Sequence, residues 1–279
     1  MRSFVVSGFA LVIALSLLIA PSLAGTRSQA QERVTLTVSA ASDLTFAFED
    51  LGRRFEEETG ISIALNFGST GELTQQIIAG APVDVFAAAN IAFIDELSEE
   101  GLTLPDTEAL YARGRIVIWP RSGLEIAIDD LNDLARAEVK RIAIANPDHA
   151  PYGLAAKEAM ISAGIWDEIQ DKLVLGENIS DTFRYGETGD VDVAIVALSL
   201  AVRTDAEWVL IDEEMHEPID QALAVITCTD HEEEARAFAD FVNSEEGRAI
   251  MRGYGFVLPG EVLDLDAIAT PQAAATPVQ

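Results

Sequence analysis

Apolar and polar positions follow two different periods along this chain, and each period predicts a kind of element. Short apolar runs, some of them alternating with polar residues, predict strands. We expect strands at residues 34–40, 61–67, 83–89, 113–120, 141–145, 174–175, 191–198, 207–211 and 221–229. Apolar residues spaced by three and four predict amphipathic helices between these runs. We expect helices at residues 44–58, 72–79, 91–100, 128–136, 154–162, 166–173, 182–188, 232–242 and 245–252.

Strands that alternate with helices predict an α/β fold with parallel or mixed sheets covered on both faces. The units fall into two groups, which predict two lobes with a cleft between them. Because an open sheet edge is unfavourable, we expect the last strand to return to the first lobe, so that two strands cross between the lobes. Lobe one is then residues 34–112 plus 221–262, and lobe two is residues 113–220. Hinges are expected near residues 112–114 and 217–221.

The two ends of the chain carry other patterns. Arg2, the apolar run Phe4–Ala20 and the small residues Ser22-Leu23-Ala24 predict a signal peptide at residues 1–24. The competing interpretation is a membrane anchor, although the run is slightly shorter than the ~20 residues that span a bilayer. Residues 25–33 predict a flexible lead-in, and residues 263–279, rich in Ala, Pro, Thr and Gln, predict a disordered tail. The protein is therefore expected in the periplasm or outside the cell envelope.

Composition excludes several classes of partner. The chain has 18 basic and 47 acidic residues, for a net charge of −29. Nucleic acids and anionic membranes are unsuitable partners because both require basic patches. The single cysteine, Cys228, allows no internal disulfide, and we expect it to pack as a small apolar residue inside the last strand.

Four turns share one arrangement, in which a predicted strand ends and a helix begins at hydroxyl-bearing or small residues. They lie at Ser42, at Ser69-Thr70, at Pro151-Tyr152-Gly153 and at Ile179-Ser180. Such turns meet at the carboxyl ends of the strands, where α/β proteins bind ligands. Free N–H groups and a partial positive charge at helix starts suit an anion. The alternative is that Ser and Thr only cap their own helices.

Enzyme motifs are missing from this sequence. No G-x-S-x-G elbow, phosphate-binding loop or G-x-G-x-x-G fingerprint occurs. The three histidines lie in separate polar segments without metal-ligand spacing. We therefore expect no catalytic residue, no metal ligand and no cofactor. His149, in lobe two, either stabilises its own turn or contacts the ligand. An exported α/β enzyme that uses His149 remains one alternative, and a ligand-free structural or sensor protein is another.

Several ordered motifs give this chain a family resemblance. It resembles the molybdate-binding proteins of bacterial ABC importers, which have the type II, two-lobed fold of periplasmic solute-binding proteins. The resemblance covers about residues 34–258 and is carried by AASDL at 40–44, FGSTGEL at 67–73, QIIAGAPVDVF at 76–86, NPDHAPYG at 146–153, AKEA at 156–159 and RGYGF at 252–256.

The resemblance implies an oxyanion site without counter-charge, built from hydroxyls and backbone N–H groups. Ser42 and Thr70, with Ser69 beside it, would donate from lobe one, and the backbone N–H groups of Tyr152 and Ile179 from lobe two. Some members add a tyrosine hydroxyl at the position that Ala197 holds here; the Tyr152 hydroxyl could replace it. The Asp43 carboxylate is expected to turn away from the cleft.

The implied function is an exported, monomeric receptor that captures molybdate, and tungstate, between its lobes. It would deliver the ion to the membrane permease of an ABC importer with its cytoplasmic ATPase. The net charge does not prevent this, because salt screens repulsion beyond ~8 Å and neutral donors act at short range. The alternative is a receptor for sulfate or an organic anion on the same fold, which the size of the pocket decides.

Overall fold

A computed structural model describes residues 34–268 of the chain. The predicted signal peptide and lead-in lie outside the described residues. The predicted disordered tail lies partly inside them: residues 263–268 are ordered and include a short 3-10 helix, η5 (Leu265–Ala267). This difference has a physical cause, because Leu263 and Ile268 pack against the hydrophobic core. Within residues 34–268, no helix has the length and apolar character that crossing a membrane requires.

The first sheet has five strands in the order β2-β1-β3-β10-β4. The first three strands along the chain run parallel, and β10 runs antiparallel to both of its neighbours. We refer to this sheet and the helices on it as lobe one. The strands are β1 (Thr35–Ala41), β2 (Ser62–Gly68), β3 (Val85–Ala88), β4 (Ala109–Gly114) and β10 (Ile219–Val225). The helices are α1 (Thr45–Thr59), α2 (Thr70–Ile78), α3 (Ile91–Glu99), α8 (Glu232–Val242) and α9 (Glu245–Gly253).

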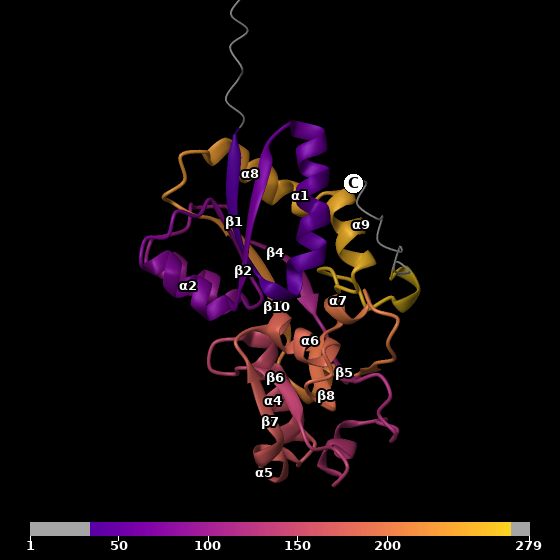
Figure 1. Cartoon of the computed structure of the whole chain (residues 1–279). Helices are drawn as coiled ribbons and strands as arrows, with labels where there is room; N and C mark the ends of the chain where they lie inside the picture. Colours follow the sequence, from indigo (N-terminus) through magenta and orange to yellow (C-terminus); the bar gives the residue numbers. More distant parts are fainter. Residues whose placement is uncertain (1–33, 269–279) are drawn as a thin grey trace, which may run out of the picture. The chain divides into compact units, whose positions relative to one another are not determined.

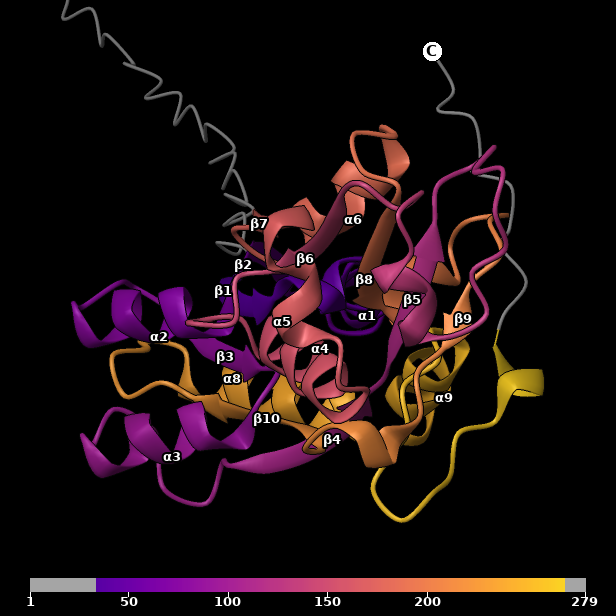
Figure 2. The same ribbon diagram turned by 90° about the horizontal axis from the view of Figure 1, so that it is seen from below.

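Helices cover both faces of this sheet. Alternate residues of β3 belong to different cores: Val85 packs into the core that includes α1 and α8, whereas Phe86 packs into a smaller core with α2 and α3. Figure 1 shows α1 running alongside β1 and β2, and Figure 2 shows α2 and α3 at the left of the view, next to β3 and β10. The expected α/β arrangement with two covered faces is confirmed.

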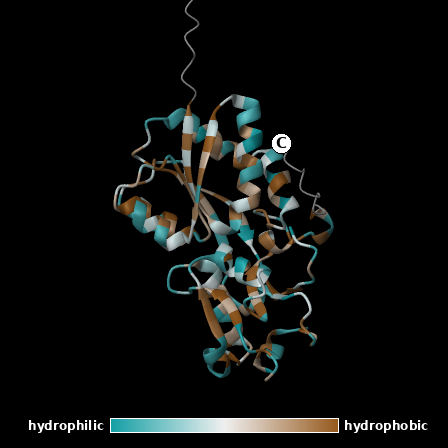
Figure 3. Ribbon diagram, in the orientation of Figure 1, coloured by the Kyte–Doolittle hydropathy of each residue, from teal (hydrophilic) through white to brown (hydrophobic). Residues whose placement is uncertain are grey.

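The second sheet, which with its helices forms lobe two, has the strand order β7-β6-β8-β5-β9. The edge strand β7 and the strands β6 and β8 run parallel, and β5 is antiparallel to β8. These strands are almost entirely apolar, and they are largely brown in Figure 3. The strands are β5 (Ile116–Pro120), β6 (Ile142–Ala145), β7 (Leu173–Gly176), β8 (Val193–Ala197) and β9 (Val209–Leu210). The helices are α4 (Pro151–Ser162), α5 (Trp166–Ile169), α6 (Ile179–Glu187) and α7 (Leu198–Ala201).

The chain passes between the sheets twice, as expected. It leaves the first sheet after Gly114, enters the second at Ile116, and returns at Ile219. The prediction of one strand at 113–120 is wrong in detail, because the backbone changes sheet at Arg115, whose buried guanidinium donates to the carbonyl of Ile211. The two crossing segments pair with each other, with Ile219 opposite Gly114.

Two other local predictions are wrong. Residues 128–136 form only the 3-10 helix η2 (Leu131–Ala135), which Asp130 and Asp133 close with a capping box. Cys228 does not lie in a strand: β10 ends at Val225, and Cys228 is exposed in the turn that follows. In the second case the polar residues Thr227 and Thr229 flank Cys228 in the turn, where the apolar run had suggested a longer strand.

Candidate functional site

Parallel strand pairing brings the two turns of lobe one together. Ala41 at the end of β1 lies opposite Gly68 at the end of β2, so the next residues, Ser42 and Ser69, are neighbours. Ser42 opens the 3-10 helix η1 (Ser42–Leu44), and Ser69 is the N-cap of α2, accepting from the N–H of Glu72. In lobe two the ends of β6 and β7 are paired in the same way, which places the starts of α4 and α6 side by side.

All five predicted site residues line one small cavity, which we call the Ser42 cavity. The volume of this cavity is only about 10 Å³. This is far below the 300 Å³ or more that organic ligands usually occupy and close to the space of a single water molecule, so the cavity is nearly closed. It is lined from lobe one by Ala41, Ser42, Asp43, Gly68, Ser69, Thr70 and Ala89, and from lobe two by Ala150, Pro151, Tyr152 and Ile179.

The cavity offers hydrogen-bond donors and no basic side chain among its lining residues. The Ser42 hydroxyl is buried and has no hydrogen-bond partner. The Thr70 hydroxyl accepts from the N–H of Ala89 at 3.1 Å, so its own hydrogen is available to donate. Tyr152 and Ile179 lie in the first turns of α4 and α6, where backbone N–H groups have no partner inside the helix.

Ser69 differs from the other predicted donors, because its hydroxyl already has partners in the protein. Its Oγ lies 2.8 Å from Nδ1 of His149, which comes from lobe two. Beside it, the N–H of Gly71 donates to the carbonyl oxygen of His149 at 3.0 Å. His149 therefore does two things: its backbone N–H donates to the carbonyl oxygen of Asn146 within its own turn at 3.4 Å, and its imidazole contacts Ser69 of lobe one. Ser69 and His149 together connect the lobes.

Asp43 lies at the centre of a buried network between the lobes. Its Oδ2 accepts from the hydroxyl of Tyr152 at 2.8 Å and from the amide of Gln221 at 2.7 Å. Tyr111 completes the network by donating to Gln221 at 2.8 Å. The Oδ1 atom of Asp43 is buried and has no hydrogen-bond partner.

Two expectations about this corner are wrong. The Asp43 carboxylate does not turn away from the cleft, because the hydroxyl of Tyr152 holds it between the lobes. For the same reason the Tyr152 hydroxyl does not replace the family's tyrosine near Ala197: it is bonded to Asp43 and Gln221. Gly114 makes this possible, since a Cβ there would lie 2.0 Å from the Tyr152 hydroxyl.

Burial sets the electrostatics of this network. It raises the pKa of Asp43 to about 6, although the hydrogen bonds from Gln221 and Tyr152 act in the opposite direction. Burial also raises the pKa of Tyr111 and of Tyr152 well above the ordinary value, with the charge of Asp43 as a further cause. Both phenols are therefore neutral donors at physiological pH.

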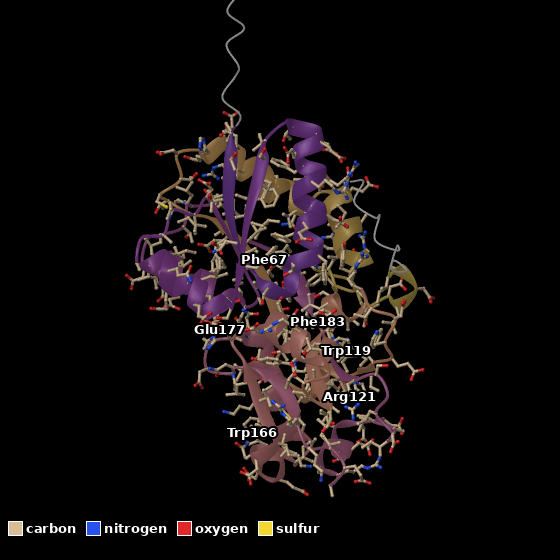
Figure 4. All side chains as sticks on the ribbon, in the orientation of Figure 1. Phe67, Trp119, Arg121, Trp166, Glu177 and Phe183 are labelled. Atoms are coloured by element: carbon tan, nitrogen blue, oxygen red, sulfur yellow. The ribbon has the colours of Figure 1, made fainter. Side chains whose placement is uncertain are left out.

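Further contacts join the lobes around the cavity. Ser180 donates to the carbonyl oxygen of Ser42 at 2.9 Å, and Ser199 donates to that of Asp43 at 2.8 Å. Phe46 of α1 meets Phe183 of α6 edge to face with ring centroids 6.5 Å apart, and Phe183 stacks on Trp119 at 4.8 Å (Figure 4). These bonds explain why the described residues form one compact unit rather than two.

Three residues of this network and its surroundings were not predicted from the sequence: Tyr111, Ser199 and Gln221. Gln221 was recognisable in the sequence as a polar residue at the start of an apolar run. In the structure its side chain is fully buried. Tyr111 and Ser199 were not recognisable, since their roles depend on long-range contacts with Asp43 and its partners. In the part of the chain that the structure describes, no group of three His, Cys, Asp or Glu side chains could hold a metal ion.

Comparison with known proteins places this arrangement in a family. Residues 36–257 match the family described as bacterial extracellular solute-binding protein. The molybdate-binding protein ModA of Rhodobacter capsulatus is 31% identical over 221 residues, which cover 78% of this chain and 86% of that protein. ModA of Azotobacter vinelandii is 30% identical over 249 residues, covering 88% and 98%.

The fold agrees with these sequence matches. The solved structure of the Azotobacter vinelandii periplasmic molybdate-binding protein superposes with a TM-score of 0.76 at 28% identity, over 80% of this chain and 99% of that chain. The architecture is that of a two-lobed periplasmic solute-binding protein. The chain belongs to the family of bacterial extracellular solute-binding proteins, which bind solutes and are not enzymes. The resemblance inferred from the sequence motifs is confirmed.

Proposed function

We propose that this protein is an exported receptor that captures molybdate, and tungstate of the same shape and charge, in the Ser42 cavity. The proposal is supported by the buried Ser42 hydroxyl, which has no partner in the protein. A buried polar group without a partner costs ~1–3 kcal/mol. A bound anion would remove this cost by accepting the hydrogen bond. The molybdate-binding relatives described above support the choice of ligand.

The ligand would be held by neutral donors. We assign hydroxyl donation to Ser42 and Thr70 and backbone N–H donation to Tyr152 and Ile179. Ser69 contributes by capping α2 and by holding His149, so it shapes the cavity while its hydroxyl remains bonded within the protein. The four assigned donors favour an anion whose oxygens are all ionised, because a protonated oxygen facing one of them would place its hydrogen against a donor hydrogen.

The contacts between the lobes suggest how the ion is released. Opening the cavity breaks the bonds from Ser180, Ser199 and Tyr152 to lobe one, and the paired segments at Gly114 and Ile219 act as the hinge. The closed receptor would dock on the membrane permease of an ABC importer, which is driven by a cytoplasmic ATPase. The partner subunits and the monomeric state are part of the proposal.

Titration calorimetry tests the choice of ligand. Purified protein is titrated with molybdate, tungstate, sulfate and hydrogen phosphate in separate experiments at one ionic strength. We expect one molybdate or tungstate ion per chain and much weaker binding of the other two anions. Binding of sulfate or of an organic anion, with no heat from molybdate or tungstate, would overturn the proposal.

A further inference from the structure

The Asp43 carboxyl lies beside a cavity for which we propose a dianion. It is the only acidic side chain among the residues that line the Ser42 cavity, and it directly follows Ser42. It is 1% exposed, so solvent does not screen its charge. An ionised Asp43 carboxylate and a dianion in the same buried cavity would repel each other strongly. Binding of the dianion therefore requires that the charge of Asp43 be neutralised.

Within residues 34–268, no basic side chain compensates the charge of Asp43. Burial and the hydrogen bonds from Gln221, Tyr152 and its own backbone account for its altered pKa, without a contribution from a basic residue. The groups that face it are the phenols of Tyr111 and Tyr152, the Gln221 amide and, on its backbone oxygen, the Ser199 hydroxyl. The charged or titratable groups around this corner have other partners: His149 contacts Ser69, Arg113 pairs with Asp220, and Arg115 contacts Ile211 and Glu213.

The geometry leaves one position free for a proton. Oδ2 of Asp43 already accepts two hydrogen bonds, whereas Oδ1 is buried without a partner. Protonation at Oδ1 would neutralise the carboxyl and preserve both bonds on Oδ2. We propose that Asp43 takes up one proton when the anion binds, so that the proton supplies the counter-charge that the lining residues lack. This inference rests on the proposed function.

Proton uptake by Asp43 lowers the affinity for the anion less than repulsion by an ionised Asp43 would. With a pKa of about 6, the carboxyl is protonated in roughly one molecule in ten at pH 7, so uptake weakens affinity about tenfold. Two unit charges about 4 Å apart at an effective dielectric constant of about 20 would weaken it about a thousandfold, and a dianion doubles the energy. The protonated form is therefore the one that binds. The protonation state of Asp43 therefore decides whether the cavity binds a dianion.

The expected pH dependence follows from linkage. The bound anion raises the pKa of Asp43 further, since it is a like charge. Affinity for molybdate is then constant below about pH 6 and falls about tenfold per pH unit above it, until the pKa of the loaded protein is reached. Molybdate itself carries no proton between about pH 6 and pH 8, so in this range the pH dependence of the affinity comes from the protein.

Calorimetry with molybdate between about pH 6 and pH 8 tests the inference. Each titration is repeated in two buffers with different ionisation enthalpies, which gives the number of protons taken up. The wild-type protein should take up close to one proton per anion near pH 8. Asp43→Asn, neutral at every pH, should take up none and show a flat affinity profile. Asp95→Asn, at an exposed position on α3, is the matched control and should behave as wild type.

Three results would count against these conclusions. Wild-type affinity that is independent of pH, with no proton uptake, would overturn the role of Asp43 and leave the proposed function intact. Unchanged uptake in Asp43→Asn would also overturn it, because the proton would bind elsewhere. Absence of molybdate binding at every pH would instead overturn the proposed function. If Asp43→Asn does not fold, the wild-type comparison of the two buffers still decides.

Discussion

The Ser42 and Thr70 hydroxyls differ in their hydrogen-bond partners within the protein. Thr70 accepts a hydrogen bond from Ala89, which fixes its orientation, while Ser42 has no partner at all. Both are almost fully buried. Loss of the Ser42 hydroxyl should therefore weaken the site without removing a bond within the protein, whereas loss of the Thr70 hydroxyl also leaves the N–H of Ala89 without its acceptor.

Ser42→Ala should weaken molybdate binding with little change in stability. A hydrogen bond to a charged group contributes about 1.5–3 kcal/mol, so we expect about a tenfold to 150-fold loss, measured by titration calorimetry. Ser42→Ala combined with Thr70→Val should abolish measurable binding. Ser98→Ala, at an exposed position on α3, is the control. Retained affinity in the double variant would show that the anion binds elsewhere.

Asp43 should make the ligand-free protein less stable as pH rises. Its pKa is raised from 3.8 to about 6, so the folded protein binds the proton more tightly than the unfolded chain. Stability is then greatest below the unfolded value and falls between about pH 4 and pH 6, by up to about 3 kcal/mol. Urea denaturation should show that Asp43→Asn lacks this fall and gains stability over wild type between pH 4 and pH 7. An identical pH dependence in both proteins would contradict this account.

The turns that open α2, α4 and α6 were predictable from the sequence, because strand-to-helix turns with Ser, Thr or Pro have recognisable chemistry, but each helix begins two or three residues earlier than predicted. Parallel pairing then places these turns at one edge of each sheet. What the sequence could not give was the contact between the edges. The bond from Tyr152 to Asp43 spans the lobes, so the expectation of a carboxylate turned outward was wrong. Most of strand β4 was missed: it is an edge strand, and its short apolar run, which includes the exposed Leu110, follows a polar connection and ends at Arg113.

Gly71 in the first turn of α2 allows the lobes to close. A Cβ on Gly71 would lie 2.9 Å from the carbonyl oxygen of His149. Gly71→Ala should hold the lobes apart and weaken molybdate binding by about fivefold to 150-fold, since overpacking costs about 1–3 kcal/mol. Its stability without ligand should change little, because the clash disappears when the lobes open. Gln76→Ala, exposed on the same helix, is the control, and unchanged affinity in Gly71→Ala would contradict closure at this contact.

The net charge of −29 acts on the approach of the anion rather than on its final contacts. The cavity is buried and its donors are neutral, so affinity depends on short-range bonds. The encounter rate depends on the field of the entire protein, which repels a dianion. Fold and charge are thus separable properties. The sequence predicted both, together with five of the residues that line the cavity, but not the size of the cavity, which depends on how side chains of the two lobes meet.

Association of molybdate should become faster as salt is added. Salt shortens the range of the repulsion to about 8 Å at physiological ionic strength and about 3 Å at 1 M. Stopped-flow measurement of the change in tryptophan fluorescence should therefore show an association rate that rises with ionic strength, whereas the dissociation rate changes little. A rate that falls with salt would indicate attraction by a local basic surface, contrary to the site described here.

A crystal structure of the protein with tungstate, located by its anomalous scattering, tests the site itself. The account predicts one ion in the Ser42 cavity, with its oxygens within hydrogen-bond distance of the Ser42 and Thr70 hydroxyls and of the backbone N–H groups of Tyr152 and Ile179. An ion bound outside this cavity, or held there by an arginine or lysine side chain, would contradict it.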